Sequence, residues 1–298
     1  MRLDRTLSLY LVRPLLETGI VPAKRALPIL MYHSISDTAE SGISSYYKTS
    51  TSPARFEQQM RWLTEAGFCS VDLEEGLRLA QRGIGKQEKI VVITFDDGFR
   101  DFYDSAFPVL KKSGHTATMF LPTAFLGEKR QSFKNKDCLT WQEVRELHAA
   151  EIHFGSHTAG HPVLYENSWR EIENELAASK DNLEQALGEK ITSFAYPYAF
   201  PQHDRQFVEK FQELLQKSGY QSCATTVIGR MQTGDDPFCL KRLPINDDDD
   251  RTLFLAKLNG AYDWLAHPQS WFKSAHHRLG RSSRKEAGLR PVAQHQAA

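Results

Sequence analysis

The sequence has 298 residues, of which 41% are hydrophobic and 25% charged, and its 37 Lys and Arg residues balance 37 Asp and Glu residues. These values are typical of a folded globular protein, and the balanced charge excludes a net basic field that would attract nucleic acid. The length suits one barrel-sized domain, because α/β barrels commonly contain about 200–250 residues. The four cysteines lie far apart without a Cys-x-x-Cys pair, so we expect free thiols at Cys69, Cys138, Cys223 and Cys239.

Residues 1–26 precede the first predicted strand, and we expect them to form an amphipathic helical extension. The apolar run Leu7–Val12 is too short for a secretory signal, and no small-residue cleavage site follows it. No run in the sequence has the length needed to cross a bilayer. We therefore expect a cytoplasmic protein whose extension packs on the main domain, with attachment to a membrane surface as the alternative.

Apolar strand-like segments alternate with helical segments along the rest of the chain. The strand-like segments are 27–32, 90–95, 116–121, 151–156, 192–197, 220–226 and 238–245. The helical segments are 53–66, 72–82, 101–113, 140–149, 168–187, 205–218 and 251–265. Seven such units predict a parallel sheet covered on both faces and favour an α/β barrel over residues 27–265. Residues 266–298 are polar without an apolar period, so we expect a flexible tail.

Two adjacent carboxylates, Asp96 and Asp97, follow the apolar run Ile90–Ile93 and precede Gly98. Neighbouring side chains on a strand point to opposite faces, so both can reach one site only where the strand ends in a bend. Two close carboxylates repel each other unless a cation neutralises one of them. The pair therefore indicates one metal ligand and one base, with an ordinary Asp-Gly turn as the alternative.

Two histidines, His157 and His161, lie in the segment Gly155–Pro162 after a further apolar stretch. Gly160 and Pro162 disfavour a helix there, so the pair is not simply two neighbours on a helix surface. Both motifs lie at the downstream ends of predicted strands, where the active sites of α/β folds gather. We therefore predict a divalent metal site built from the two imidazoles and one carboxylate.

These two motifs, followed in order by Phe194–Tyr198, resemble the motifs of the polysaccharide deacetylases that carry the NodB homology domain. The resemblance spans residues 27–245. It implies a distorted (β/α)7 barrel, one divalent metal ion, usually zinc, and hydrolysis of acetyl groups from N-acetylated or O-acetylated sugars.

The resemblance also implies a role for each motif residue. Asp97, His157 and His161 are the expected ligands of the metal ion, and Asp96 is the expected general base. The backbone N–H of Tyr198 is expected to form part of an oxyanion hole.

One departure from the family pattern concerns the residue that orients the base. Many members begin the third motif with an Arg, whereas this sequence has Ala195. Arg242, in the last strand-like segment, is the candidate replacement, and a solvated surface Arg is the alternative.

A second departure is that no copy of the motif bearing the general acid follows Tyr198. The segment Leu27–Ser34 instead resembles the opening strand of the poly-N-acetylglucosamine deacetylases, in which that motif is permuted to the front. We therefore assign the acid to His33. The alternative is a structural His33, with His203 or His267 as the acid.

Loops supply further candidates. Residues 36–52 are a candidate substrate rim or a plain solvent loop, and 126–139 form a second polar loop. Asp247–Asp250 is expected to be a solvated turn that caps the last helix and not a calcium loop. The aromatic residues that are candidates to stack on sugars, or to pack in the core, are Tyr46, Tyr47, Trp141 and Phe200.

The sequence thus predicts a hydrolase that removes acetyl groups from an N-acetylated carbohydrate. An O-acetyl esterase and a small-amide hydrolase are alternatives within the same fold. A catalytically idle barrel that binds glycan is a third alternative. A pure binder has no need of an unligated carboxylate beside a metal, which argues against the third.

Overall fold

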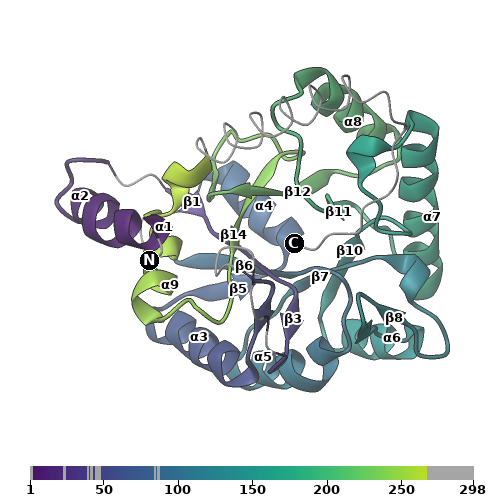
Figure 1. The fold of residues 1–298 in the computed structure, drawn as a ribbon, viewed down its shortest axis with the longest axis horizontal. Coiled ribbons are helices and arrows are strands. Elements are labelled where there is room, and N and C mark those ends of the chain that lie inside the picture. The colour runs from purple at the N-terminus through teal and green to yellow at the C-terminus, as the bar shows by residue number, and fades with distance from the viewer. Residues whose placement is uncertain are drawn as a thin grey trace.

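The computed structural model describes residues 3–22, 25–38, 40, 43, 48–83, 85 and 88–266. Seven parallel strands close into a barrel (Figure 1), because β6 pairs with β2 as well as with β7. Around the ring the strands are β2 (Ile29–Tyr32), β14 (Leu240–Pro244), β12 (Ser222–Ile228), β11 (Ser193–Ala195), β10 (His153–Ser156), β7 (Thr118–Leu121) and β6 (Ile90–Phe95). An eighth strand, β5 (Cys69–Val71), lies outside the ring beside β6. The predicted seven-stranded α/β barrel is confirmed.

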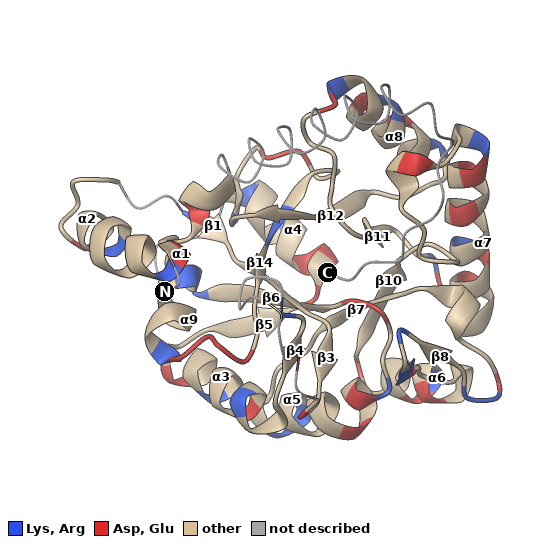
Figure 2. Cartoon of the chain, in the orientation of Figure 1, with Lys and Arg blue, Asp and Glu red and all other residues tan. Residues whose placement is uncertain are grey.

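Helices surround the barrel and bear charged side chains of both signs, as the bands on α3, α7 and α8 show in Figure 2. They are α3 (Pro53–Glu65), α4 (Leu73–Arg82), η2 (Phe102–Ala106), α5 (Phe107–Ser113), α6 (Trp141–Ala149), α7 (Trp169–Leu187), α8 (Arg205–Lys217) and α9 (Arg251–Leu258). Shorter 3-10 turns are η3 (Thr123–Phe125), η4 (Leu164–Glu166) and η5 (Asp263–Leu265). α7 begins at a capping box on Ser168 and ends at Gly188, which has a φ of 72°.

Side chains alternate between the barrel interior and the helix-facing layer. On β6, Val92 belongs to the inner cluster, while Val91 and Ile93 pack toward the helices. The same alternation places Thr94 and then Asp96 on the interior side at the carboxyl end of the strand. Because side chains alternate in this way on parallel strands, residues from the ends of several strands meet at the carboxyl end of the barrel, which we call its mouth.

Helix α4 covers the opposite, amino end of the barrel. Its residues Leu73 and Leu77 share the inner cluster with Leu27 and Val92. Gly76 permits this close approach, because a Cβ added there would lie 2.5 Å from Val92 Cγ2. α4 is visible through the ring in Figure 1.

Two expectations about secondary structure were wrong. The predicted helix 251–265 is split, because Gly260 adopts a φ of +94°, and a Cβ added there would clash with the Arg230 guanidinium unless that group moved. The polar loop 126–139 contains an antiparallel hairpin of β8 (Ser132–Phe133) and β9 (Lys136–Asp137). Two further short pairs join β1 (Ala26–Leu27) to β13 (Met231–Gln232) and β3 (Ser34–Ile35) to β4 (Ser50–Thr51).

The acidic run is not a solvated turn. Asp249 is fully buried and its carboxylate lies 2.7 Å from the buried ammonium of Lys257. Asp247 accepts a hydrogen bond from Ser52 N at 3.0 Å. Asp250 caps α9 as expected, accepting from Leu253 N at 3.0 Å. All four cysteines are free thiols, also as expected.

The N-terminal segment is helical through α1 (Leu3–Leu7), η1 (Ser8–Val12) and α2 (Arg13–Glu17), and it lies at the edge of the molecule beside α9 (Figure 1). Trp264 Nε1 donates to Ser8 Oγ at 3.0 Å, and Arg5 pairs with Asp250 at 2.6 Å. None of the helices in the described ranges combines the length and the apolar character needed to span a membrane. The expected tail lies outside the described residues, apart from Ala266.

Candidate active site

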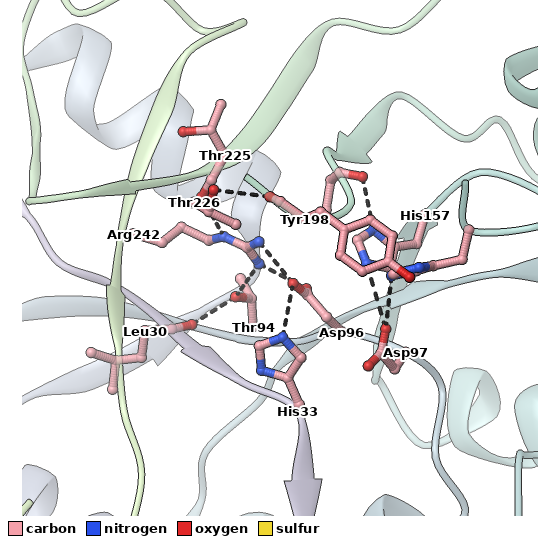
Figure 3. Close-up of polar contacts among 12 residues, drawn as sticks. Leu30, His33, Thr94, Asp96, Asp97, His157, Tyr198, Thr225, Thr226 and Arg242 are labelled. Atoms are coloured by element: carbon pink, nitrogen blue, oxygen red, sulfur yellow. Dashed lines mark hydrogen bonds and ion pairs between the residues drawn. The ribbon is translucent and has the colours of Figure 1, made fainter. Parts of the chain in front are cut away.

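The predicted site residues meet at the mouth of the barrel (Figure 3): most of them follow β2, β6, β10 and β11, and Arg242 reaches the site from within β14. The backbone there is unusual, because several non-glycine residues have a positive φ, a conformation that L-residues adopt at a cost. These are Asp97 (75°), Thr158 (68°), His161 (53°) and Tyr198 (58°). The turn at Asp97 directs its side chain into the mouth next to Asp96, although the two are neighbours in sequence.

Asp97, His157 and His161 form the predicted cluster. Each offers one ligand atom, and these atoms all lie within 4.8 Å of one another. Asp97 Oδ1 is 3.1 Å from His161 Nε2 and 3.7 Å from His157 Nε2. All three residues are buried.

The imidazole of His157 is prepared to act as a ligand. Its Nδ1 donates to the carbonyl oxygen of Ala195 at 2.8 Å, which leaves the lone pair of Nε2 facing Asp97. Burial lowers the pKa of His157 to about 4, although the carboxylates of Asp96 and Asp97 oppose that effect. The ring is therefore neutral at neutral pH, which is the form that binds metals.

The cluster fits a divalent metal ion. Asp97 Oδ1 and His161 Nδ1 are buried, and neither has a hydrogen-bond partner within the described ranges. Burial alone would raise the pKa of Asp97, but contact with His161 and the charge of Lys134 hold it well below its usual range. Two imidazoles and one carboxylate are a donor set that zinc accepts at sites that keep an open position.

Asp96 is held by a different partner. Arg242 donates to both of its carboxylate oxygens, at 2.7 and 2.8 Å, from a side chain that is 0% exposed. The same guanidinium donates to Thr225 O at 3.0 Å and to Thr94 Oγ1 at 3.2 Å. The alternative of a solvated surface Arg242 is therefore wrong. Burial would raise the pKa of Asp96, but the charge and hydrogen bonds of Arg242, together with the imidazoles of His157 and His33, more than offset it, so the pKa lies below its usual value.

His33 lies on the other side of Asp96 (Figure 3). Its Nε2 is 3.9 Å from Asp96 Oδ2, and its side chain is 20% exposed, so the ring borders both Asp96 and the open mouth. Burial lowers the pKa of His33, while the nearby carboxylates of Asp96 and Asp97 favour its protonated form.

Tyr198 borders the cluster through its ring, whose centroid is 4.6 Å from that of His161. Its carbonyl oxygen accepts from Thr226 Oγ1 at 3.0 Å. Its backbone N–H has no acceptor within the part of the chain that the structure describes. That N–H is thus available to a ligand at the mouth.

Sequence reasoning missed Lys134, at the tip of the β8–β9 hairpin. Its Nζ lies 3.1 Å from Asp97 Oδ2, and 4.7 and 5.4 Å from the ring centroids of Phe133 and Tyr198. Lys134 and Asn135 have φ values of 50° and 60°, as a two-residue hairpin turn requires. The Lys-Asn pair inside a polar loop was the available signal for the turn.

The remaining candidates are the aromatic residues expected to stack on sugars and the histidines that are alternatives to His33. Phe200 is 1% exposed and packs against Tyr196, so it cannot stack on a sugar. Trp141 is partly buried against the core, and His203 contacts the ring of Tyr165 at 6.1 Å between centroids. The candidates that lie outside the described residues are Tyr46, Tyr47 and His267.

Residues 83–222 match the family model for polysaccharide deacetylase. YxkH of Bacillus subtilis (strain 168), a protein classed with the polysaccharide deacetylases, is 32% identical over 225 residues, which cover 76% of this chain and 72% of YxkH. A poly-beta-1,6-N-acetyl-D-glucosamine N-deacetylase of Staphylococcus aureus is 27% identical over 208 residues, covering 67% of this chain and 69% of that protein. The solved structure of the Streptococcus pyogenes deacetylase PplD in complex with acetate superposes with a TM-score of 0.68 at 25% identity, covering 79% of this chain and 99% of PplD.

The cluster predicts which substitutions remove metal. His157→Ala and His161→Ala each delete one ligand, so we expect metal affinity to fall by more than the roughly 10–100-fold typical of losing an outer partner of a ligand. Metal content of the purified proteins measures this, with His203→Ala as a control that retains metal. Full occupancy in His157→Ala would contradict the ligand assignment.

The buried pair predicts a large effect on stability. Arg242→Met leaves the Asp96 carboxylate buried without its partner, which is expected to lower the free energy of unfolding by about 3–5 kcal/mol in urea denaturation at neutral pH. As a control, Arg61→Ala removes only the exposed ion pair with Glu65, so the free energy of unfolding should change by less than about 0.5 kcal/mol.

The same pair predicts the pH dependence of that loss. In the wild type the pKa of Asp96 is depressed, so its contribution is present above the unfolded pKa of about 3.9 and is lost as pH falls through the lower folded value. In Arg242→Met, the largest influence that opposes burial is gone, so the pKa of Asp96 rises and mild acidification should recover part of the lost stability. A deficit that is constant with pH would show that Asp96 is not its source.

Proposed function

Because the chain belongs to the polysaccharide deacetylase family, whose members are hydrolases that act on amide bonds, we propose that it removes acetyl groups from N-acetylated sugars and uses a bound divalent metal ion. One observation carries the proposal: an ionised carboxylate that does not belong to the Asp97–His157–His161 cluster lies next to that cluster. It is Asp96, whose oxygens are bound by Arg242. A barrel that only binds glycan has no use for that arrangement. The donor set supports zinc as the ion.

Similarity to the poly-beta-1,6-N-acetyl-D-glucosamine N-deacetylase of Staphylococcus aureus supports an amino sugar as substrate. A barrel mouth that is open to solvent at His33 and Tyr198 suits a glycan residue, since both side chains are partly exposed. The acetamido group would enter between these two residues and the cluster.

Asp97, His157 and His161 would hold the ion, which when bound supplies Lewis acidity to water and to the acetyl carbonyl. Asp96 accepts the proton of the attacking water, and Arg242 holds both of its oxygens so that the carboxylate keeps one orientation. The Tyr198 N–H donates to the acetyl oxygen as negative charge develops there.

His33 completes the reaction by donating a proton to the leaving nitrogen. The C–N bond then breaks, the sugar leaves as a free amine and the acetyl group leaves as acetate. An amine is a poor leaving group without that proton, whereas an alcohol from an O-acetyl ester depends on it less.

The proposal is tested by acetate release. We expect release from N-acetylglucosamine oligomers and much less from O-acetylated xylan, with activity abolished by chelation and restored by zinc. Faster release from acetylated xylan would make the protein an O-acetyl esterase. No release from either, with metal bound, would favour a glycan-binding role.

The proposed roles of Asp96 as base and Asp97 as metal ligand predict opposite phenotypes for substitutions at the two positions. Asp96→Asn cannot accept the proton, so we expect it to retain metal while activity per folded molecule falls by about 10²–10⁴-fold. Asp97→Asn should lose metal instead. Metal content, folded fraction and acetate release measured on both variants test this, and exchanged phenotypes would reverse the two roles.

The proposed role of His33 as general acid predicts that the effect of replacing it depends on the leaving group of the substrate. His33→Ala should slow hydrolysis of an N-acetyl amide by at least about 10²-fold but spare an activated aryl acetate, because a phenolate departs without a proton. Metal content should not change. Equal losses on both substrates would indicate a structural His33, and His203→Ala would then be the next variant to assay.

A further inference from the structure

The two oxygens of the Asp97 carboxylate have different surroundings. Oδ1 faces the imidazoles, 3.1 Å from His161 Nε2 and 3.7 Å from His157 Nε2, and it has no hydrogen-bond partner among the described residues. Oδ2 instead accepts a hydrogen bond from Lys134 Nζ at 3.1 Å. The carboxylate is therefore held with one oxygen presented to the cluster and the other oxygen occupied.

Lys134 is placed by the β8–β9 hairpin, which is anchored to the elements that carry the site. Leu139, just after the hairpin, donates its backbone N–H to Gly98 O at 2.9 Å, in the turn at the end of β6. Lys136 of β9 donates to Ser34 Oγ at 2.5 Å, at the start of β3. These two anchors fix the base of the hairpin and so direct its tip over the mouth.

Aromatic rings hold the tip of the hairpin as well. The ring of Phe133 stacks on that of Phe125, with 4.2 Å between centroids, and its centroid is 5.0 Å from that of His161. The ammonium of Lys134 lies over the rings of Phe133 and Tyr198, at 4.7 and 5.4 Å from their centroids. A cation over aromatic rings is attracted to them, so the ammonium is confined to the position from which it reaches Asp97.

We propose that Lys134 is a positioning residue for the metal ligand Asp97 and thereby strengthens the binding of the divalent ion. The inference rests on the metal site of the proposed function. By occupying Oδ2, the ammonium leaves Asp97 to bind the ion through Oδ1 alone. Carboxylate ligands are commonly hydrogen-bonded by such an outer partner, and its loss typically weakens metal binding by about 10–100-fold.

The charge of Lys134 by itself would act in the opposite direction. A cation near the cluster repels a metal ion, so removing a lysine that has no positioning role would strengthen metal binding. Solvent weakens this repulsion, because the Lys134 side chain is 41% exposed, whereas Asp97 is 3% exposed. The direction of the change in metal affinity therefore separates positioning from simple repulsion.

Zinc binding to the full chain tests the proposal. Lys134→Met removes the donor while keeping a long side chain, and we expect its Kd for zinc, measured by competition with a chelator, to rise by about 10–100-fold. Lys134→Arg keeps a charged donor and should recover most of the affinity. Lys129→Met removes an exposed lysine from the same loop and should bind zinc like the wild type.

A second measurement reports the geometry of the carboxylate. The visible spectrum of the cobalt(II)-loaded protein depends on the number and arrangement of ligand atoms. Both oxygens of Asp97 can bind the ion in Lys134→Met, so its spectrum should differ from that of the wild type, whereas Lys134→Arg should match the wild type. Lys134→Ala should reproduce both effects of Lys134→Met if that variant fails to fold.

Three results would overturn the proposal. Tighter zinc binding in Lys134→Met would show that its charge only repels the ion. Unchanged zinc binding together with a raised KM for N-acetylglucosamine oligomers would show that Lys134 contacts the sugar instead of positioning Asp97. Wild-type protein that binds no zinc would refute the metal site of the proposed function, and the inference with it, so the two failures are distinguishable.

Discussion

The buried ion pair between Arg242 and Asp96 is the constraint on which the rest of the site depends. It joins β14 to β6 across the end of β2 and holds both oxygens of one carboxylate. In a low-dielectric interior an unpaired carboxylate next to Asp97 would be too costly to keep ionised. The guanidinium therefore allows two negative charges on consecutive residues and leaves the second one to the imidazoles.

The positive φ of Asp97 is the backbone feature that complements the ion pair between Arg242 and Asp96. An extended residue at this position would point its side chain away from the interior, because neighbours on a strand alternate. The left-handed turn at Asp97, continued by Gly98, brings both carboxylates to the mouth with different surroundings. Arg242 lowers the pKa of one, and His161 and Lys134 lower the pKa of the other. The two carboxylates thus have different partners, as the proposed roles of Asp96 as base and Asp97 as ligand require.

The sequence predicted the parts of the structure that depend on local pattern. The seven strands, α7 and the cluster of Asp97 with two histidines follow from apolar runs, caps and short motifs. Long-range packing decided what was missed: Lys134 reaches Asp97 only because a hairpin folds over the mouth, and Asp249 is buried only because Lys257 comes from α9. Arg242 could be named as a candidate, but its place in a strand-like segment did not by itself distinguish a buried partner from a surface side chain.

Helix α4 covers the amino end of the barrel and so closes one of its two ends. Leu73 and Leu77 pack against Val92, so in the described structure the mouth at the opposite end is the route to the Asp97–His157–His161 cluster. Under the proposed function, a glycan lying across that mouth would stand in the route by which acetate departs. Release of the small acid would then be coupled to movement of the sugar chain, because both would use the same opening.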